Sequence, residues 1–123
     1  MLPPVQASKS LFGVQEVDQF HTRVWRLDDY RNAYQLPLPD LIKLDVQGFE
    51  VEVLQGAGEC LRSAKGVLSE VSFIEYYEGQ CLFHDVVGQL AEFGLFVRAF
   101  GFNTVLGSAV GQTDVLFLRT SCL

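Results

Sequence analysis

The sequence predicts an α/β domain whose sheet is mainly parallel and has one antiparallel strand at its carboxyl end. Short apolar runs typical of buried strands alternate with stretches in which apolar residues recur at helical spacing. The last two strand-like runs have no helix between them and should therefore pair antiparallel. Right-handed crossovers between the earlier strands then predict a three-layer domain.

The composition excludes several classes of function. The chain has 123 residues and a net charge of −6, which suits one domain and makes phosphate binding by a basic face unexpected. The longest uncharged stretch, residues 99–113, is too short and too polar to span a bilayer. Three widely spaced cysteines without a targeting segment predict a reducing cytoplasm, and no His or Cys spacing suggests a metal.

The amino-terminal part has weak periodicity. Residues 1–21 are expected to be irregular, with a short extended piece over 11–14, as if the domain had lost its beginning. Residues 22–27 alternate polar and apolar side chains, which predicts a half-exposed strand. Asp28 and Asp29 then introduce a short helical segment over 30–35, the first as N-cap and the second as a first-turn acid.

Residues 40–50 are the stretch around which the rest is organised. An apolar run from Leu41 to Val46, interrupted only by Lys43 and Asp45, ends at Gly48 and predicts a buried strand followed by a sharp turn. A helix should continue to about residue 64, or divide in two at its internal glycines. The remaining expected elements are a strand over 67–74, a helix over 82–93, a strand over 95–100, a Gly-rich loop over 101–113 and a strand over 114–119.

Two carboxylates lie inside strand patterns. Asp45 and Glu70 should reach the same rim of the sheet, where ligands bind in open α/β folds. A carboxylate in such a place is costly unless it is paired or used. The alternatives are that Asp45 caps the following turn and that Glu70 faces solvent or a lysine. A metal site formed by Asp45, Glu50 and Glu70 is a weaker alternative, because no His or Lys completes it.

Five motifs resemble the FkbM family of class I S-adenosylmethionine-dependent methyltransferases, over about residues 8–120. They are VWRLDD (24–29), DLIKLDVQGFEVEVLQGA (40–57), EVSF (70–73), YEGQ (77–80) and QTDVLF (112–117). The resemblance implies that residues 22–120 form the carboxyl-terminal half of a Rossmann-like methyltransferase sheet. The glycine-rich cofactor cradle would precede Met1, which leaves the strand at Leu41 with a bare edge and a tendency to self-associate.

The same resemblance implies a function. It implies O-methylation of a hydroxyl on a sugar or natural-product-like acceptor, with S-adenosyl-L-methionine as cofactor. Asp45 and Glu70 would be catalytic, Asp45 and Gln47 would contact the cofactor, and Gln47 and Tyr77 would contact a small-molecule or glycan acceptor. Many family members carry Glu at the position of Gln47. The alternative is a catalytically inactive remnant or a partner-dependent interaction module, and neither nucleic acid nor membrane is an expected partner.

Overall fold

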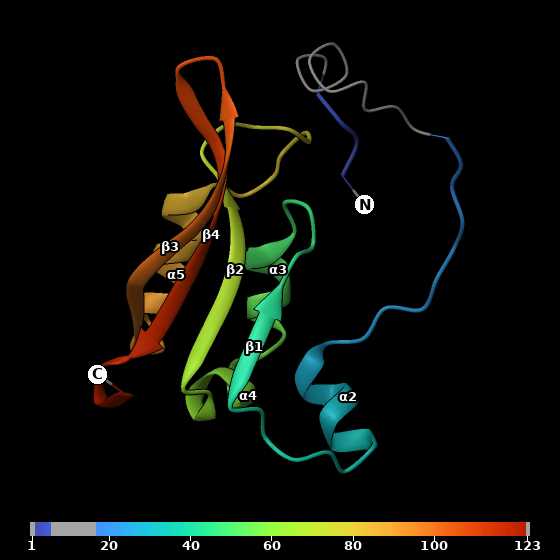
Figure 1. The fold of residues 1–123 in the computed structure, drawn as a ribbon. Helices are drawn as coiled ribbons and strands as arrows, with labels where there is room; N and C mark the ends of the chain where they lie inside the picture. The colour runs from blue at the N-terminus through green and yellow to red at the C-terminus, as the bar shows by residue number, and fades with distance from the viewer. Residues whose placement is uncertain (1, 6–16, 123) are drawn as a thin grey trace.

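The computed structural model describes residues 2–5 and 17–122 (Figure 1). The expected extended piece over 11–14 lies outside the described residues. The elements are α2 (Leu27–Ala33), β1 (Leu41–Leu44), α3 (Glu50–Gln55), α4 (Gly58–Ser63), β2 (Gly66–Ser72), α5 (Phe83–Ala91), β3 (Leu95–Leu106), β4 (Ala109–Arg119) and a 3-10 turn (Thr120–Cys122). No helix among the described residues is long and apolar enough to cross a membrane.

The four strands form one mixed sheet in the order β1-β2-β4-β3. β1 and β2 are parallel, whereas β4 is antiparallel to both of its neighbours. The first three strands therefore run in the same direction, as predicted, and the last two form the predicted antiparallel pair. The third strand does not lie beside the second, because β4 folds back into the space between them.

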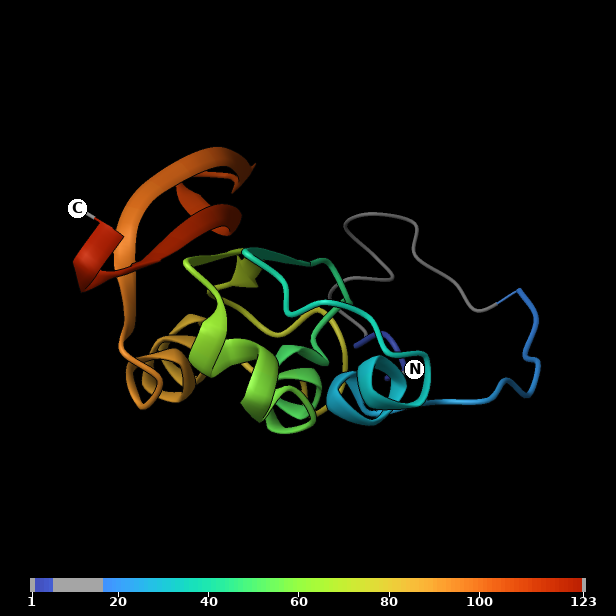
Figure 2. The ribbon, with the colours of Figure 1, turned by 90° about the horizontal axis from the view of Figure 1, so that it is seen from below.

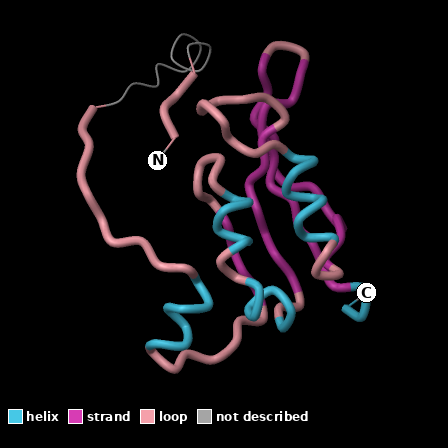
Figure 3. The backbone as a smooth tube through the Cα atoms, turned by 180° about the vertical axis from the view of Figure 1, so that it is seen from behind, coloured by secondary structure: helices cyan, strands magenta, loops and turns pink. Residues whose placement is uncertain are grey.

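The described residues form two layers, not the three that we predicted. All helices lie on one face of the sheet, as Figure 2 and Figure 3 show from below and from behind. The reason lies in the handedness of the crossovers. The connections from β1 to β2 and from β2 to β3 step across the sheet in the same direction, so two right-handed crossovers put their helices on the same face.

Two predicted elements were wrong. Residues 101–113 form the ends of β3 and β4 rather than a loop, and the two strands meet at a tight turn in which Gly107 has a φ of 58°. Hydrogen-bonded pairing of β3 with β4 outweighs the low strand propensity of the glycines in this segment. The pairing of the two strands contains three register shifts. Residues 22–26 have no regular structure, because no strand among the described residues pairs with them and satisfies their backbone groups.

The core lies between the helices and the facing side of the sheet. Its largest fully buried side chains come from every layer, including Leu54, Leu61, Val67, Leu90 and Phe117. The helix after β1 is divided at Gly56 and Ala57 into α3 and α4, which confirms the predicted split.

Arg119 ties the end of β4 to this layer. Its guanidinium donates to the carbonyl oxygens of Leu61 at 2.6 Å, Phe93 at 2.8 Å and Ala64 at 3.0 Å. It thereby satisfies backbone acceptors at and after the carboxyl ends of α4 and α5, which have no partner within their own helices.

Asp28 caps a helix other than its own, so the predicted N-cap role was wrong. The N-cap of α2 is Arg26, and Asp28 and Asp29 both stand in the first turn. The Asp28 carboxylate accepts the backbone N–H of Glu59 at 2.8 Å and of Cys60 at 3.1 Å. It therefore fills the N-cap position of α4 from outside and fastens α2 to α4.

Candidate functional site

The turn between β1 and α3 has an unusual backbone. Gln47 has a φ of 54° and Gly48 a φ of 93°, a region that L-residues other than glycine seldom adopt. A Cβ atom at Gly48 would also overlap the Cβ of Gln80. Glycine is therefore required there both by its backbone conformation and by the close approach of the following loop.

The loop over residues 75–80 packs against this turn. The buried side chain of Gln80 accepts the backbone N–H groups of Tyr76 at 2.5 Å and Tyr77 at 2.7 Å. The N–H of Cys81 donates to the carbonyl of Gly48 at 3.2 Å. These bonds fix the loop at the carboxyl end of β1. Sequence reasoning assigned Gln80 no role, although it belongs to the YEGQ motif.

The amino terminus holds the same loop from its other side. The N–H of Val5 donates to the carbonyl of Tyr76 at 2.8 Å, and the N–H of Glu78 donates to the carbonyl of Pro3 at 2.7 Å. Residues 3–5 were expected to be irregular, and they contribute one isolated bridge, between Pro4 and Tyr77. The loop is therefore clamped between the β1–α3 turn and the start of the chain.

Three of the predicted site residues form one hydrogen-bonded row. The Tyr77 hydroxyl donates to Oε1 of Gln47 at 3.1 Å, and Nε2 of Gln47 donates to the Asp45 carboxylate at 3.0 Å. All three lie at the surface or half-buried. The row leaves the second oxygen of Asp45 and the lone pairs of the Tyr77 hydroxyl available to a ligand.

Glu70 lies one strand away from this row, on the sheet face that bears no helix. It stands opposite Asp114 in the antiparallel pairing of β2 with β4. Burial raises the pKa of Glu70, and the negative charges of Asp45 and Asp114 raise it further. Asp45, Glu70 and Asp114 thus form an acidic rim across three strands. Sequence reasoning missed Asp114, because its position depends on β4 lying between β2 and β3.

Glu50 does not belong to this rim. Its carboxylate is buried and accepts two hydrogen bonds, from the backbone N–H of Gly48 at 3.3 Å and from the thiol of Cys81 at 3.3 Å. Burial and the Glu50 charge raise the pKa of Cys81 to about 11. Glu50, and not Asp45, therefore caps the turn. Among the described residues, no three His, Cys, Asp or Glu side chains are grouped to hold a metal ion.

Comparisons with known proteins agree with the motifs. Residues 3–102 match the family described as Methyltransferase FkbM domain. The 2-O-methyltransferase NoeI of Sinorhizobium fredii (strain NBRC 101917 / NGR234) is 39% identical over 73 residues, which are 59% of this chain and 30% of that protein. The chain therefore aligns with less than a third of that relative's length. No solved structure matches the chain. Because the family match covers most of its residues, this chain belongs to the FkbM methyltransferase family.

Proposed function

We propose that this chain forms the acceptor side of an S-adenosyl-L-methionine-dependent O-methyltransferase that acts on a hydroxyl of a sugar or natural-product-like molecule. The observation that supports it most directly is the row of Tyr77, Gln47 and Asp45 at the carboxyl end of β1. Polar groups at that end of a parallel pair are where ligands of open α/β sheets bind. The relative NoeI is a 2-O-methyltransferase, which supports oxygen as the methylated atom.

The residues suit transfer of a methyl group to a hydroxyl. The donor supplies a methyl group already activated by a positive sulfonium, so alignment is the main task of the protein. The Tyr77 hydroxyl and the Gln47 amide would orient the acceptor hydroxyl. Asp45 would accept its proton as the new carbon–oxygen bond forms. Glu70, whose pKa is raised, is the second group on the rim able to hold a proton.

The acidic rim also suits the charge of the donor. Asp45, Glu70 and Asp114 carry negative charge on one face of the sheet, which would attract a sulfonium cation. Asp45 and Gln47 would contact the donor at this rim. The glycine-rich cradle that the resemblance implies lies outside these residues. We therefore propose that residues 22–120 act as the carboxyl-terminal half of a Rossmann-like methyltransferase domain.

A binding titration of the complete gene product that contains these residues tests the assignment. S-adenosyl-L-methionine, which carries the positive sulfonium, is titrated by calorimetry in the absence of an acceptor into the unaltered protein and into Asp45→Asn and Asp29→Asn variants. Asp29 is an exposed acid on α2 and serves as the matched control. We expect Asp45→Asn to weaken binding roughly tenfold through loss of one charge. Equal affinities for all three proteins would contradict the donor-contact role.

The alternative is an inactive remnant or a partner-dependent interaction module. The coding DNA before Met1 separates the two functions. An in-frame strand, glycine-rich turn and acid-tipped second strand would support the enzyme. A stop codon and promoter directly upstream, together with no binding of S-adenosylhomocysteine, would support the remnant.

A further inference from the structure

Gln80 touches two neighbouring parts of the site, the β1–α3 turn and the loop over residues 75–80. Its Cβ lies so close to Gly48 that a Cβ atom at Gly48 would overlap it. Its side-chain oxygen accepts the backbone N–H groups of Tyr76 at 2.5 Å and Tyr77 at 2.7 Å. Gln80 is only 8% exposed, and a buried N–H that loses its acceptor is costly. One buried side chain thus joins the turn to the loop that carries Tyr77.

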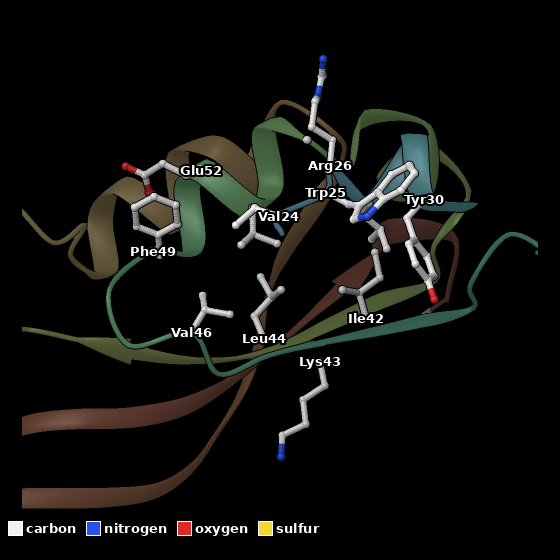
Figure 4. Close-up of a pocket in the computed structure, with 13 residues that line it drawn as sticks. Val24, Trp25, Arg26, Tyr30, Ile42, Lys43, Leu44, Val46, Phe49 and Glu52 are labelled. Atoms are coloured by element: carbon white, nitrogen blue, oxygen red, sulfur yellow. The ribbon is translucent and has the colours of Figure 1, made fainter. Parts of the chain in front are cut away.

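The turn is the fixed half of this junction. Val46 before it and Phe49 after it lie on the helix side of β1, among the apolar side chains that line a cavity of about 570 Å³ (Figure 4). The carboxylate of Glu50 also holds the turn by accepting the N–H of Gly48 at 3.3 Å. Gln47 lies between these fixed points, so its backbone has a defined position from which its side chain takes part in the hydrogen-bonded row.

The loop depends on Gln80 for its attachment on the side of the turn. The carboxylate of Glu75 accepts the N–H of Gly79 at 2.5 Å, but both residues belong to the loop itself. The backbone of residues 3–5 pairs with the other side of the loop. The two N–H groups that donate to Gln80 therefore fix the backbone of Tyr77 relative to the turn.

We propose that Gln80 is a positioning residue of the methyl-transfer site, which acts through Tyr77 and does not itself contact a substrate. The inference rests on the proposed function, in which the Tyr77 hydroxyl orients the hydroxyl that is methylated. Gln80 holds the backbone of Tyr77 at the place from which its hydroxyl reaches Gln47 at 3.1 Å. A displacement of about 1 Å, caused by a residue that does not touch the chemistry, can cost about 10²-fold in rate.

Two substitutions of Gln80 separate hydrogen bonding from packing. Gln80→Glu keeps an oxygen in the place of the amide oxygen, whether the new carboxyl group is ionised or protonated. Gln80→Met keeps the length of the side chain and its contact with the turn, but has only a weak acceptor in its sulfur. Activity retained with glutamate and lost with methionine would therefore assign the effect to the two hydrogen bonds. Gln89→Met is the matched control, because Gln89 lies half-buried in the second half of α5.

Hydrogen exchange followed by NMR tests the two bonds directly, in the complete gene product that contains these residues. We expect the amides of Tyr76 and Tyr77 to exchange at least roughly tenfold faster in Gln80→Met than in the unaltered protein, because both lose a buried acceptor. Gln80→Glu and Gln89→Met should keep the unaltered rates. Unchanged protection of both amides in Gln80→Met would overturn the proposal, whatever the activity of the variant.

A double-mutant cycle tests whether Gln80 acts through Tyr77. With a hydroxyl acceptor that the unaltered protein methylates, Gln80→Met should lower kcat/KM for that acceptor roughly tenfold to hundredfold, and should leave the affinity for S-adenosyl-L-methionine within about threefold. Gln80→Glu should restore most of the loss. In a Tyr77→Phe background, Gln80→Met should cause little further loss, since the hydroxyl that it positions is absent. Equal losses in the two backgrounds would overturn the proposal.

The kinetic outcomes also separate this role of Gln80 from the proposed function. Absence of turnover by the unaltered protein with a panel of hydroxyl acceptors would contradict the proposed function and, with it, the role of Gln80 in methyl transfer. Turnover by the unaltered protein together with full activity of Gln80→Met would overturn the role of Gln80 alone.

Discussion

Removal of the Asp28 carboxylate should detach α2 from α4. Asp28 accepts two backbone N–H groups at the start of α4, at 2.8 and 3.1 Å. Loss of a helix cap costs about 0.5–2 kcal/mol, and loss of negative charge at a helix amino terminus costs about 0.3–1 kcal/mol more. Asp28→Ala should therefore lower the free energy of unfolding by about 1–2.5 kcal/mol, measured by urea unfolding followed by circular dichroism.

The pH dependence of this loss identifies its cause. Burial alone would raise the pKa of Asp28, but the two N–H groups and Arg26 outweigh it, so the pKa is lowered. A carboxylate with a lowered pKa stabilises the fold above its ordinary pKa and loses that contribution as the pH falls through the folded value. The difference between Asp28→Asn and the unaltered protein should therefore be present at pH 7 and shrink below about pH 4.

The neighbouring acid provides the control for both measurements. Asp29 stands in the same first turn and is exposed, so Asp29→Ala should lower the unfolding free energy only by the helix-dipole contribution of about 0.3–1 kcal/mol. Equal losses for the two alanine variants would refute the capping argument. So would a loss for Asp28→Asn that stays unchanged down to pH 3.

Three further substitutions have defined outcomes. Arg119→Met should lower the unfolding free energy by about 2–4 kcal/mol, since three carbonyls lose a charged donor, whereas Arg98→Met on exposed β3 should change little. Glu70→Gln should stabilise the fold by about 0.5–1 kcal/mol at pH 7 by removing a like charge opposite Asp114. Because the pKa of Glu70 is raised, this gain should vanish below the ordinary pKa of glutamate, where the side chain is neutral; Glu78→Gln is its exposed control. Gly48→Ala should cost about 1–3 kcal/mol through strain and overlap with Gln80. Gly79→Ala is the control, because Gly79 has a φ of 72° but open space around it, so this variant should lose only the free energy of backbone strain. Equal losses of unfolding free energy for the two variants would mean that the overlap with Gln80 does not matter. Thermal unfolding measures all of these.

The order of strands and helices was predictable because it depends on local periodicity. The runs at Leu41, Val67 and Leu95 are apolar enough to specify strands on their own. The hairpin formed by residues 101–113 was not predictable in this way. Its glycines favour a loop locally, and only pairing along the full length of β3 and β4 makes them strand.

The site was predictable only where its residues show in the local sequence pattern. Asp45 and Glu70 interrupt strand patterns, and that interruption is visible in the sequence. The capping role of Asp28 was not, since it depends on α4, which the fold brings close to α2. Asp114 joins the rim only because β4 lies next to β2. Spacing along the chain cannot reveal such contacts.

The rate of methyl transfer by the complete gene product tests the central claim most directly. Formation of S-adenosylhomocysteine from S-adenosyl-L-methionine is followed with a panel of sugar and natural-product-like hydroxyl acceptors, for the unaltered protein, Asp45→Asn and Asp29→Asn. If Asp45 accepts the hydroxyl proton, Asp45→Asn should lower kcat by about 10²–10⁴-fold, while Asp29→Asn keeps the unaltered rate. Full turnover by Asp45→Asn would contradict the role that we propose for the β1 rim.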